Sequence, residues 1–209
     1  MLFRGMYRNL LTFILAFSCI SIPLCSAEEP ERTTISGISF VRPGGWKSLP
    51  TAAIRQLNEK LEASTAGLPK QTYQYAIQHG STDYWFTYPY ILVQVNSRGR
   101  IPESELESLE KLDSEVAKAG NEVSQRLGKT VASLKMGKSY YDSQAKIIWA
   151  RGESELVGVG EVINVTATLL TSKGTVVFYG YARKGKLGRL EEDFERLVRS
   201  VELDVENRY

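Results

Sequence analysis

Apolar and polar residues alternate most regularly between Lys146 and Arg183. This period of two predicts three strands, over roughly Lys146–Leu156, Val162–Thr171 and Thr175–Arg183. Their connections are short and contain glycine, so the strands must be antiparallel neighbours, because a parallel crossover needs about a dozen residues or more. The stretch therefore predicts an antiparallel meander around which the rest of the chain is organised.

The third predicted strand is apolar on both of its faces, whereas the second alternates strictly between apolar and polar residues. A strand that is apolar on both faces is expected near the centre of a covered sheet. Gly180 lies within this strand, where a glycine indicates a bulge or the close approach of another part of the chain.

The remaining strands are expected before the meander, over Ile35–Val41, Gln71–Gln78 and Tyr84–Asn96, with an irregular strand over Val131–Tyr141. Pro89 interrupts the third of these and predicts a bulge, an edge position or a break, because proline cannot donate a hydrogen bond to a neighbouring strand. A short edge strand is also expected over Val201–Val205.

Apolar residues spaced three and four apart predict helices that start at Pro50-Thr51, after Pro102 and at about Leu190, the last one running to Arg199. The second helix has its apolar stripe from Leu109 to Leu127. Trp46 precedes the first helix and is expected to anchor the core beneath it. Runs of strands with separate helices favour an α+β fold, an antiparallel β-sheet with helices packed on it.

The first 27 residues have the pattern of an export signal. Arg4 and Arg8 precede an apolar run, Leu10–Leu24, which is shorter than the ~20 residues that a membrane-spanning helix needs. Cys25-Ser26-Ala27 then offers small residues for cleavage. We expect a signal peptide over 1–27, cleaved near Ala27, and a single α+β domain over 28–209 in the periplasm or outside the cell. An uncleaved anchor is the alternative.

Removing this segment changes the charge balance and the cysteine content. The chain has 26 Lys and Arg against 24 Asp and Glu, and residues 1–27 contain two of the basic residues and none of the acidic ones. The remaining chain is formally neutral, which argues against a general nucleic-acid binder. Both cysteines, Cys19 and Cys25, also lie in the leader, so neither a disulfide nor a cysteine metal site is expected.

No catalytic constellation is evident in the sequence. His79 is the only histidine and falls in a predicted turn, where an exposed, structural role is favoured over general-base catalysis. Two Ser-x-x-Lys tetrads, Ser108…Lys111 and Ser143…Lys146, lack the partner motifs of Ser-Lys hydrolases. No cofactor and no metal site are expected.

Two segments are candidates for contact with a ligand or partner. The first is the aromatic stretch with Tyr84, Phe86, Tyr88 and Tyr90, which can line a groove or simply pack the sheet. The second is a basic loop that can contact an acidic partner or anionic lipid, or remain solvated. Its cations are Arg183, Lys184, Lys186 and Arg189.

The segment Phe40–Trp46, with Pro43, Gly45 and Trp46 at its end, resembles the opening of PsbP/Mog1-like domains, and the closing helix Phe194–Val201 is also similar to theirs. This resemblance implies an α/β/α sandwich and a non-enzymatic accessory or binding role. It transfers no functional residue to this chain.

These observations favour an exported accessory or binding protein without catalytic activity, which binds a protein partner or a small ligand in the cell envelope and does not bind nucleic acid. The alternatives are a membrane-tethered subunit of an envelope complex and a hydrolase with an unrecognised site. Membrane contact is expected only through an uncleaved leader or the basic loop.

Overall fold

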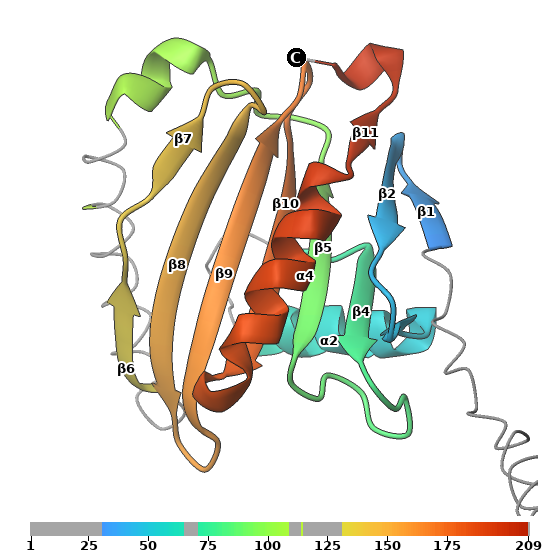
Figure 1. Ribbon diagram of the computed structural model, residues 1–209, viewed down its shortest axis with the longest axis vertical. Helices are drawn as coiled ribbons and strands as arrows, with labels where there is room; N and C mark the ends of the chain where they lie inside the picture. Colours follow the sequence, from blue (N-terminus) through green and yellow to red (C-terminus); the bar gives the residue numbers. More distant parts are fainter. Residues whose placement is uncertain (1–30, 65–70, 109–113, 115–130, 209) are drawn as a thin grey trace, which may run out of the picture.

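The computed structural model describes residues 31–64, 71–108, 114 and 131–208. Its strands form two antiparallel sheets (Figure 1). The smaller sheet has the order β1-β2-β11, with β1 Glu31–Ile35, β2 Ile38–Arg42 and β11 Glu202–Leu203. The larger sheet has the order β3-β4-β5-β10-β9-β8-β6, and β7 also pairs with β8. Its strands are β3 Trp46–Ser48, β4 Tyr75–His79, β5 Tyr90–Asn96, β6 Val131–Met136, β7 Tyr140–Asp142, β8 Ile147–Leu156, β9 Gly160–Leu170 and β10 Thr175–Arg183.

The meander predicted from the alternation is confirmed as β8, β9 and β10, with ends within two residues of those expected. Strand β10 is central, as predicted, because it pairs with β9 on one side and β5 on the other. Phe178, at its middle, lies opposite Ala167 and Val93 and is fully buried. The two strands that flank it therefore protect this part of the backbone from water.

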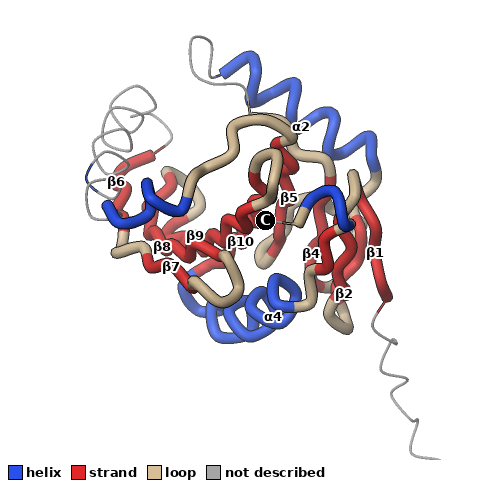
Figure 2. Tube along the Cα trace, turned by 90° about the horizontal axis from the view of Figure 1, so that it is seen from above, coloured by secondary structure: helices blue, strands red, loops and turns tan. Residues whose placement is uncertain are grey.

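Helices cover both faces of the larger sheet, α2 (Thr51–Ser64) on one face and α4 (Leu187–Arg199) on the other (Figure 2). The described residues also include three short 3₁₀ helices, η1 Glu103–Ser108, η2 Lys184–Lys186 and η3 Val205–Asn207. The arrangement confirms the predicted α+β fold with an α/β/α layering. In the described part of the chain, no helix is long and apolar enough to cross a membrane.

The core between α4 and the larger sheet is closely packed at Gly180. A Cβ atom there would lie 2.8 Å from Val165 Cγ2 and 2.9 Å from Phe194 Cδ2. The close approach predicted from this glycine is therefore confirmed, and α4 is the element that approaches. Four buried residues of α4 face the sheet: Leu190, Phe194, Leu197 and Val198.

The expectation of one strand over Ile35–Val41 is wrong. The segment forms a hairpin whose turn residues, Ser36 and Gly37, have φ values of 48° and 80°. Positive φ at both central residues makes a tight turn whose twist matches that of the flanking strands. Serine gives little sign of such a turn, since it seldom adopts positive φ.

Two further expectations are corrected by the structure. The predicted strand over Tyr84–Asn96 starts only at Tyr90, because Pro89 has no N–H to donate to a neighbouring strand and so interrupts the pairing. Trp46 is a core anchor, but beneath the last helix, not the first. It is fully buried, and its indole Nε1 donates to Asp193 Oδ2 of α4 at 2.8 Å.

Other expectations fall wholly or partly outside the described residues. These are the leader over 1–27 and the apolar stripe from Leu109 to Leu127. The first helix is confirmed as α2, and the last is confirmed with its start three residues earlier than expected. The edge strand predicted over Val201–Val205 is present as β11 and belongs to the smaller sheet.

Candidate binding pocket

The basic loop becomes η2 and the first turn of α4, and the structure divides its four cations between different environments. Lys184 forms an ion pair with Glu161 at 3.0 Å, and Arg183 places its guanidinium carbon 5.9 Å from the centre of the Tyr88 ring. Lys186 and Arg189 line a pocket. Of the four cations, these last two line this pocket, whereas Lys184 lines a different, smaller one.

This cavity, called the basic pocket below, has a volume of about 480 Å³. One wall comes from the end of β4 and the turn before β5, and the other from the β10–α4 connection. Its lining residues are His79, Tyr88, Pro89, Gly185, Lys186, Gly188 and Arg189. The basic pocket thus brings Tyr88 of the aromatic segment together with two cations of the basic loop.

Arg189 and His79 form the closest polar contact in the basic pocket, with 2.7 Å between Arg189 Nη1 and His79 Nε2. A guanidinium has only donors, so His79 Nε2 must accept and the imidazole is neutral in this contact. The arginine therefore keeps its full positive charge while its position is fixed.

The environment of His79 favours the neutral ring. Burial is the main cause that holds the pKa of His79 below its ordinary value, and the positive charge of Arg189 acts in the same direction. Lys186 also lowers this pKa, whereas the carboxylate of Asp193 raises it. The edge of the Trp46 ring packs on the imidazole, and His79 N donates to Pro89 O at 3.1 Å, which holds the residue against the pocket wall.

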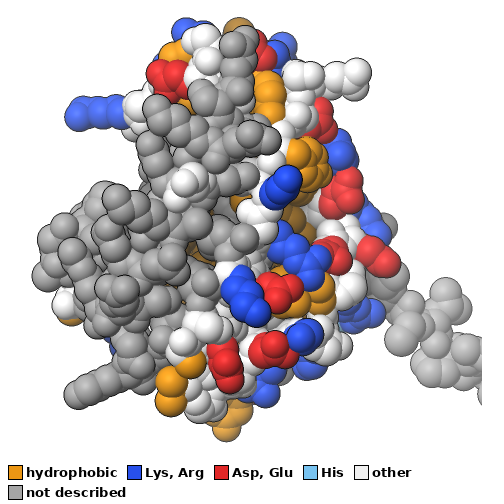
Figure 3. Space-filling model, turned by 90° about the vertical axis from the view of Figure 1, so that its left-hand side faces the viewer, with side chains coloured by type: hydrophobic (Ala, Val, Ile, Leu, Met, Phe, Trp, Pro, Cys, Tyr) orange, Lys and Arg blue, Asp and Glu red, His pale blue; other side chains and the backbone are white. Residues whose placement is uncertain are grey.

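Neither cation that lines the basic pocket has an acidic partner among the described residues. Asp193 is close to His79, but its carboxylate already accepts from Trp46 Nε1 at 2.8 Å and lies 3.6 Å from Arg196. Several other charged residues of α4 form ion pairs. Arg151 contacts Glu191, and Arg199 contacts Glu195. Figure 3 shows basic and acidic side chains close to one another on one side of the molecule.

Two glycines leave the basic pocket open. A Cβ atom built on Gly185 or on Gly188 would meet no heavy atom within 4 Å. Neither residue has a positive φ, so the backbone would accept a side chain at both places. The absence of side chains here therefore preserves space and is not required by the local conformation.

The other aromatic candidates do not line the basic pocket. Phe86 and Tyr90 pack in the cluster beneath α2, where the Tyr90 ring stacks on Tyr181 with 5.0 Å between centroids. Burial raises the pKa of the Tyr90 hydroxyl far above its ordinary value. Tyr84 is 78% exposed. Of the four aromatic candidates, only Tyr88 reaches the basic pocket.

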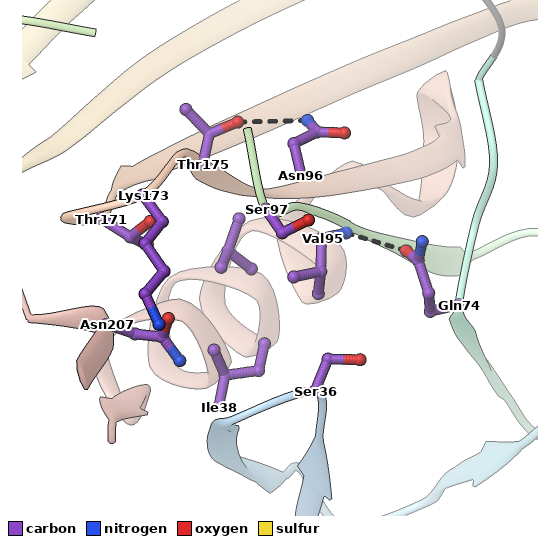
Figure 4. A pocket seen from close by; sticks show the side chains of 11 residues that line it. Ser36, Ile38, Gln74, Val95, Asn96, Ser97, Thr171, Lys173, Thr175 and Asn207 are labelled. Atoms are coloured by element: carbon purple, nitrogen blue, oxygen red, sulfur yellow. Dashed lines mark hydrogen bonds between the residues drawn. The ribbon is translucent and has the colours of Figure 1, made fainter. Parts of the chain in front are cut away.

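A second cavity of about 370 Å³, called the polar pocket below, lies between the smaller sheet and the far end of β10 (Figure 4). Several of its polar side chains already have hydrogen-bond partners within the protein. Asn96 Nδ2 donates to Thr175 Oγ1 at 3.1 Å, and Gln74 Oε1 accepts from Val95 N at 2.8 Å. Lys173, its only charged lining residue, pairs with Glu206 at 3.2 Å. This cavity therefore offers no unpaired charge.

The described residues bring no catalytic set together. No group of three or more His, Cys, Asp or Glu in this part of the chain can hold a metal ion. In the tetrad Ser143…Lys146, the lysine is ion-paired with Glu103. Lys111 of the other tetrad lies outside the described residues. His79, which the sequence assigned to an exposed turn, ends β4 and lines the basic pocket, and no short motif around it indicates this position.

The chain is similar in structure to two solved proteins from the groups that the sequence resembles. One is cyanobacterial PsbP (CyanoP) from Synechocystis sp. PCC 6803, with a TM-score of 0.48 and 11% identity over 83% of this chain and 91% of that one. The other is the Saccharomyces cerevisiae Ran-binding protein Mog1p, with a TM-score of 0.44 and 10% identity over 83% of this chain and 95% of that one. No protein-family model and no curated protein matches the sequence.

The expected resemblance to PsbP/Mog1-like domains is confirmed at this level, as a weak likeness of fold. Similarity this low carries no argument about function, so the function must be argued from the pockets and charges of this chain.

Proposed function

We propose that this protein is an exported accessory or binding protein of the cell envelope, without catalytic activity, which binds a protein partner at the basic pocket. The leader over 1–27 supports export, with cleavage near Ala27, and residues 28–209 then form the single mature domain. The contact surface includes Tyr88, Lys186 and Arg189.

One observation carries this proposal: two segments that are far apart in the sequence converge on one cavity and present cations without acidic partners there. Arginine and tyrosine are enriched where protein partners bind, because each combines a large contact area with a polar group.

The balance of charge supports a protein partner over nucleic acid. Without the leader the chain is formally neutral, since the 24 remaining basic residues match 24 acidic ones. Nucleic-acid binding depends on neutralising many phosphates and normally needs a clear basic excess. A local cluster of cations on a neutral molecule suits an acidic patch on a protein better.

The test is affinity capture from the native envelope fraction with mature protein, residues 28–209. A variant with Lys186 and Arg189 changed to serine removes the two cations of the basic pocket, and Lys173→Ser removes one exposed cation at the opposite end of β10 as a control. We expect one partner to be captured by the wild type and the control and to be lost with the double variant.

Equal capture by the wild type and the double variant would place the contact elsewhere and contradict the proposal. Mass spectrometry of the native protein tests export separately, because cleavage near Ala27 removes the first 27 residues.

A further inference from the structure

We propose that the basic pocket is an oxyanion-binding site, which takes one carboxylate or phosphate group; this rests on the proposed function, in which an acidic segment of the partner presents that group. The inference adds a chemical class of ligand to the surface. It depends on the charge, the donors and the space that the pocket offers.

The first argument is charge. Lys186 and Arg189 both line the cavity, and neither has a carboxylate partner among the described residues. The nearest acid, Asp193, is held by Trp46 and Arg196. By contrast, Lys184, two residues before Lys186, is paired with Glu161. Two neighbouring cations without a partner repel one another, and an anion between them relieves that repulsion.

The second argument is the arrangement of donors. Arg189 uses one N–H to hold the neutral His79 ring at 2.7 Å, which fixes the guanidinium without neutralising it. A guanidinium carries five N–H donors in a planar fork, and this fork matches the oxygens of a carboxylate or phosphate. Lys186 adds a second charged donor from the same loop. A positioned arginine pays less entropy on binding than a free one.

The third argument is space. Gly185 and Gly188 line the cavity, and a Cβ on either would have no heavy atom within 4 Å. A glycine costs helix stability at a position such as 188, inside α4, and its φ there is not positive. What these two glycines provide is room beside the two cations.

The same features argue against a membrane surface as the partner. Attraction to anionic lipid needs a cluster of about four or more basic residues. Here one of the four cations of the loop is paired with Glu161 and another lies over the Tyr88 ring. Two cations in a concave site suit a single anionic group better than a flat charged surface.

The direct test is a titration of mature protein with inorganic phosphate at pH 7, followed by amide chemical shifts and compared with chloride at equal ionic strength. We expect saturable shifts at Gly185, Gly188 and Arg189, with a dissociation constant on the order of 1 mM. A tetraglutamate peptide with blocked ends should cause the same shifts, and its tetraglutamine counterpart should not.

Variants locate the site. Changing Lys186 and Arg189 to glutamine should weaken phosphate binding about tenfold or more, because charge-assisted hydrogen bonds are lost. Gly188→Glu should do the same without removing either cation, since its own carboxylate enters the cavity, and an acidic residue in the first turn suits the helix. Lys173→Gln, which removes a cation outside the basic pocket, is the matched control and should retain binding.

The outcomes separate this inference from the proposed function. If phosphate and tetraglutamate leave the pocket amides unshifted, or if Gly188→Glu binds like the wild type, the oxyanion site is refuted even where a partner is captured. If phosphate saturates the pocket and no partner is captured, the oxyanion site is supported with a free anion as its ligand, and the proposed function is refuted. Binding of anionic vesicles but not of tetraglutamate would contradict the choice of a protein partner.

Discussion

One pocket lies at each end of strand β10, and the two pockets differ in whether their charged lining residues have acidic partners. At the polar pocket, Lys173 pairs with Glu206, the Asn96 amide donates to the Thr175 hydroxyl, and the Gln74 amide oxygen accepts from the backbone of Val95. At the basic pocket, Lys186 and Arg189 have no acidic partner in the described chain, and the one histidine serves only as a neutral acceptor. The charge of the first pocket is neutralised within the protein, whereas the proposed function assigns the two cations of the second to an external partner.

Glycine shows the same contrast. A Cβ on Gly174, beside the polar pocket, would lie 2.0 Å from Asn96 O, and one on Gly37 would lie 2.5 Å from Asn207 Nδ2. At the basic pocket, Gly185 and Gly188 face open space. A glycine that is required by packing and a glycine that leaves a cavity open look identical in a sequence, and only the surrounding atoms distinguish them.

The largest expected effect is a loss of stability from a substitution beside the polar pocket. Gly174→Ala should lower the free energy of unfolding by about 2 to 3 kcal/mol, because its methyl group collides with the backbone of β5 and cannot be accommodated by a flexible side chain. Gly188→Ala should leave stability unchanged or raise it by up to about 1 kcal/mol, since alanine favours the helix. Urea denaturation of both variants measures this, and equal stabilities would refute the contrast between the two glycines.

The next effect concerns ligand binding and compares the cations. Lys186→Gln alone should weaken phosphate binding at the basic pocket several-fold, because one of the two charges there is lost. Lys173→Gln at the other pocket should leave the dissociation constant unchanged, since Glu206 already neutralises that charge. Titrations at two ionic strengths check the comparison. A similar loss in both variants would mean that the effect is one of net charge and not of the pocket.

A smaller effect depends on pH and on His79. The pKa of His79 is lowered in the folded chain, below the ~6.5 of an unfolded histidine. As the pH falls through 6.5, the unfolded chain takes up this proton before the folded chain does, so stability that is fully present above the unfolded pKa is progressively lost.

His79→Gln should therefore lose less stability between pH 7.5 and 5.5 than the wild type. Phosphate should reduce the difference, because a bound anion favours the charged ring. The polar pocket is lined by no histidine and no acidic residue, so its variants provide the baseline. Denaturation curves at each pH measure this difference. If the stability of the wild type and of His79→Gln changes in parallel with pH, protonation of His79 does not affect stability and the prediction is wrong.

The smallest expected effect is at the remaining lysine of the basic loop. Lys184→Gln should change neither phosphate affinity nor partner capture, because Lys184 pairs with Glu161 and does not line the basic pocket. The same titration checks this. A loss equal to that of Lys186→Gln would extend the binding surface to the Glu161 side.

Much of the fold was predictable because it follows from local patterns. Alternation located β8, β9 and β10 within two residues, and the two apolar faces of β10 predicted its central position. The hairpin before β3 was missed because Ser36 adopts a positive φ that serine rarely shows. The face of Trp46 was assigned wrongly because pairing between β3 and β4, which sets that face, is a long-range property.

The basic pocket was predictable in parts but not as a whole. The sequence marked Tyr88, Lys186 and Arg189 as contact candidates. It did not indicate that Lys184 is neutralised by Glu161, that Tyr90 packs beneath α2, or that His79 meets Arg189. These depend on which strands are neighbours and on where α4 begins, and neither is encoded in a short motif.

The pairing of β11 with β2 has a consequence for the order in which the molecule is completed. Glu202 and Leu203 pair with Ser39 and Ile38, so strand β2 finds this neighbour in a segment that is far away in the sequence. Val41 N also donates to Ser200 Oγ at 2.8 Å. Contacts so distant in sequence form late, because a long loop must close first. The smaller sheet therefore cannot close until the segment around Leu203 is available to pair with β2.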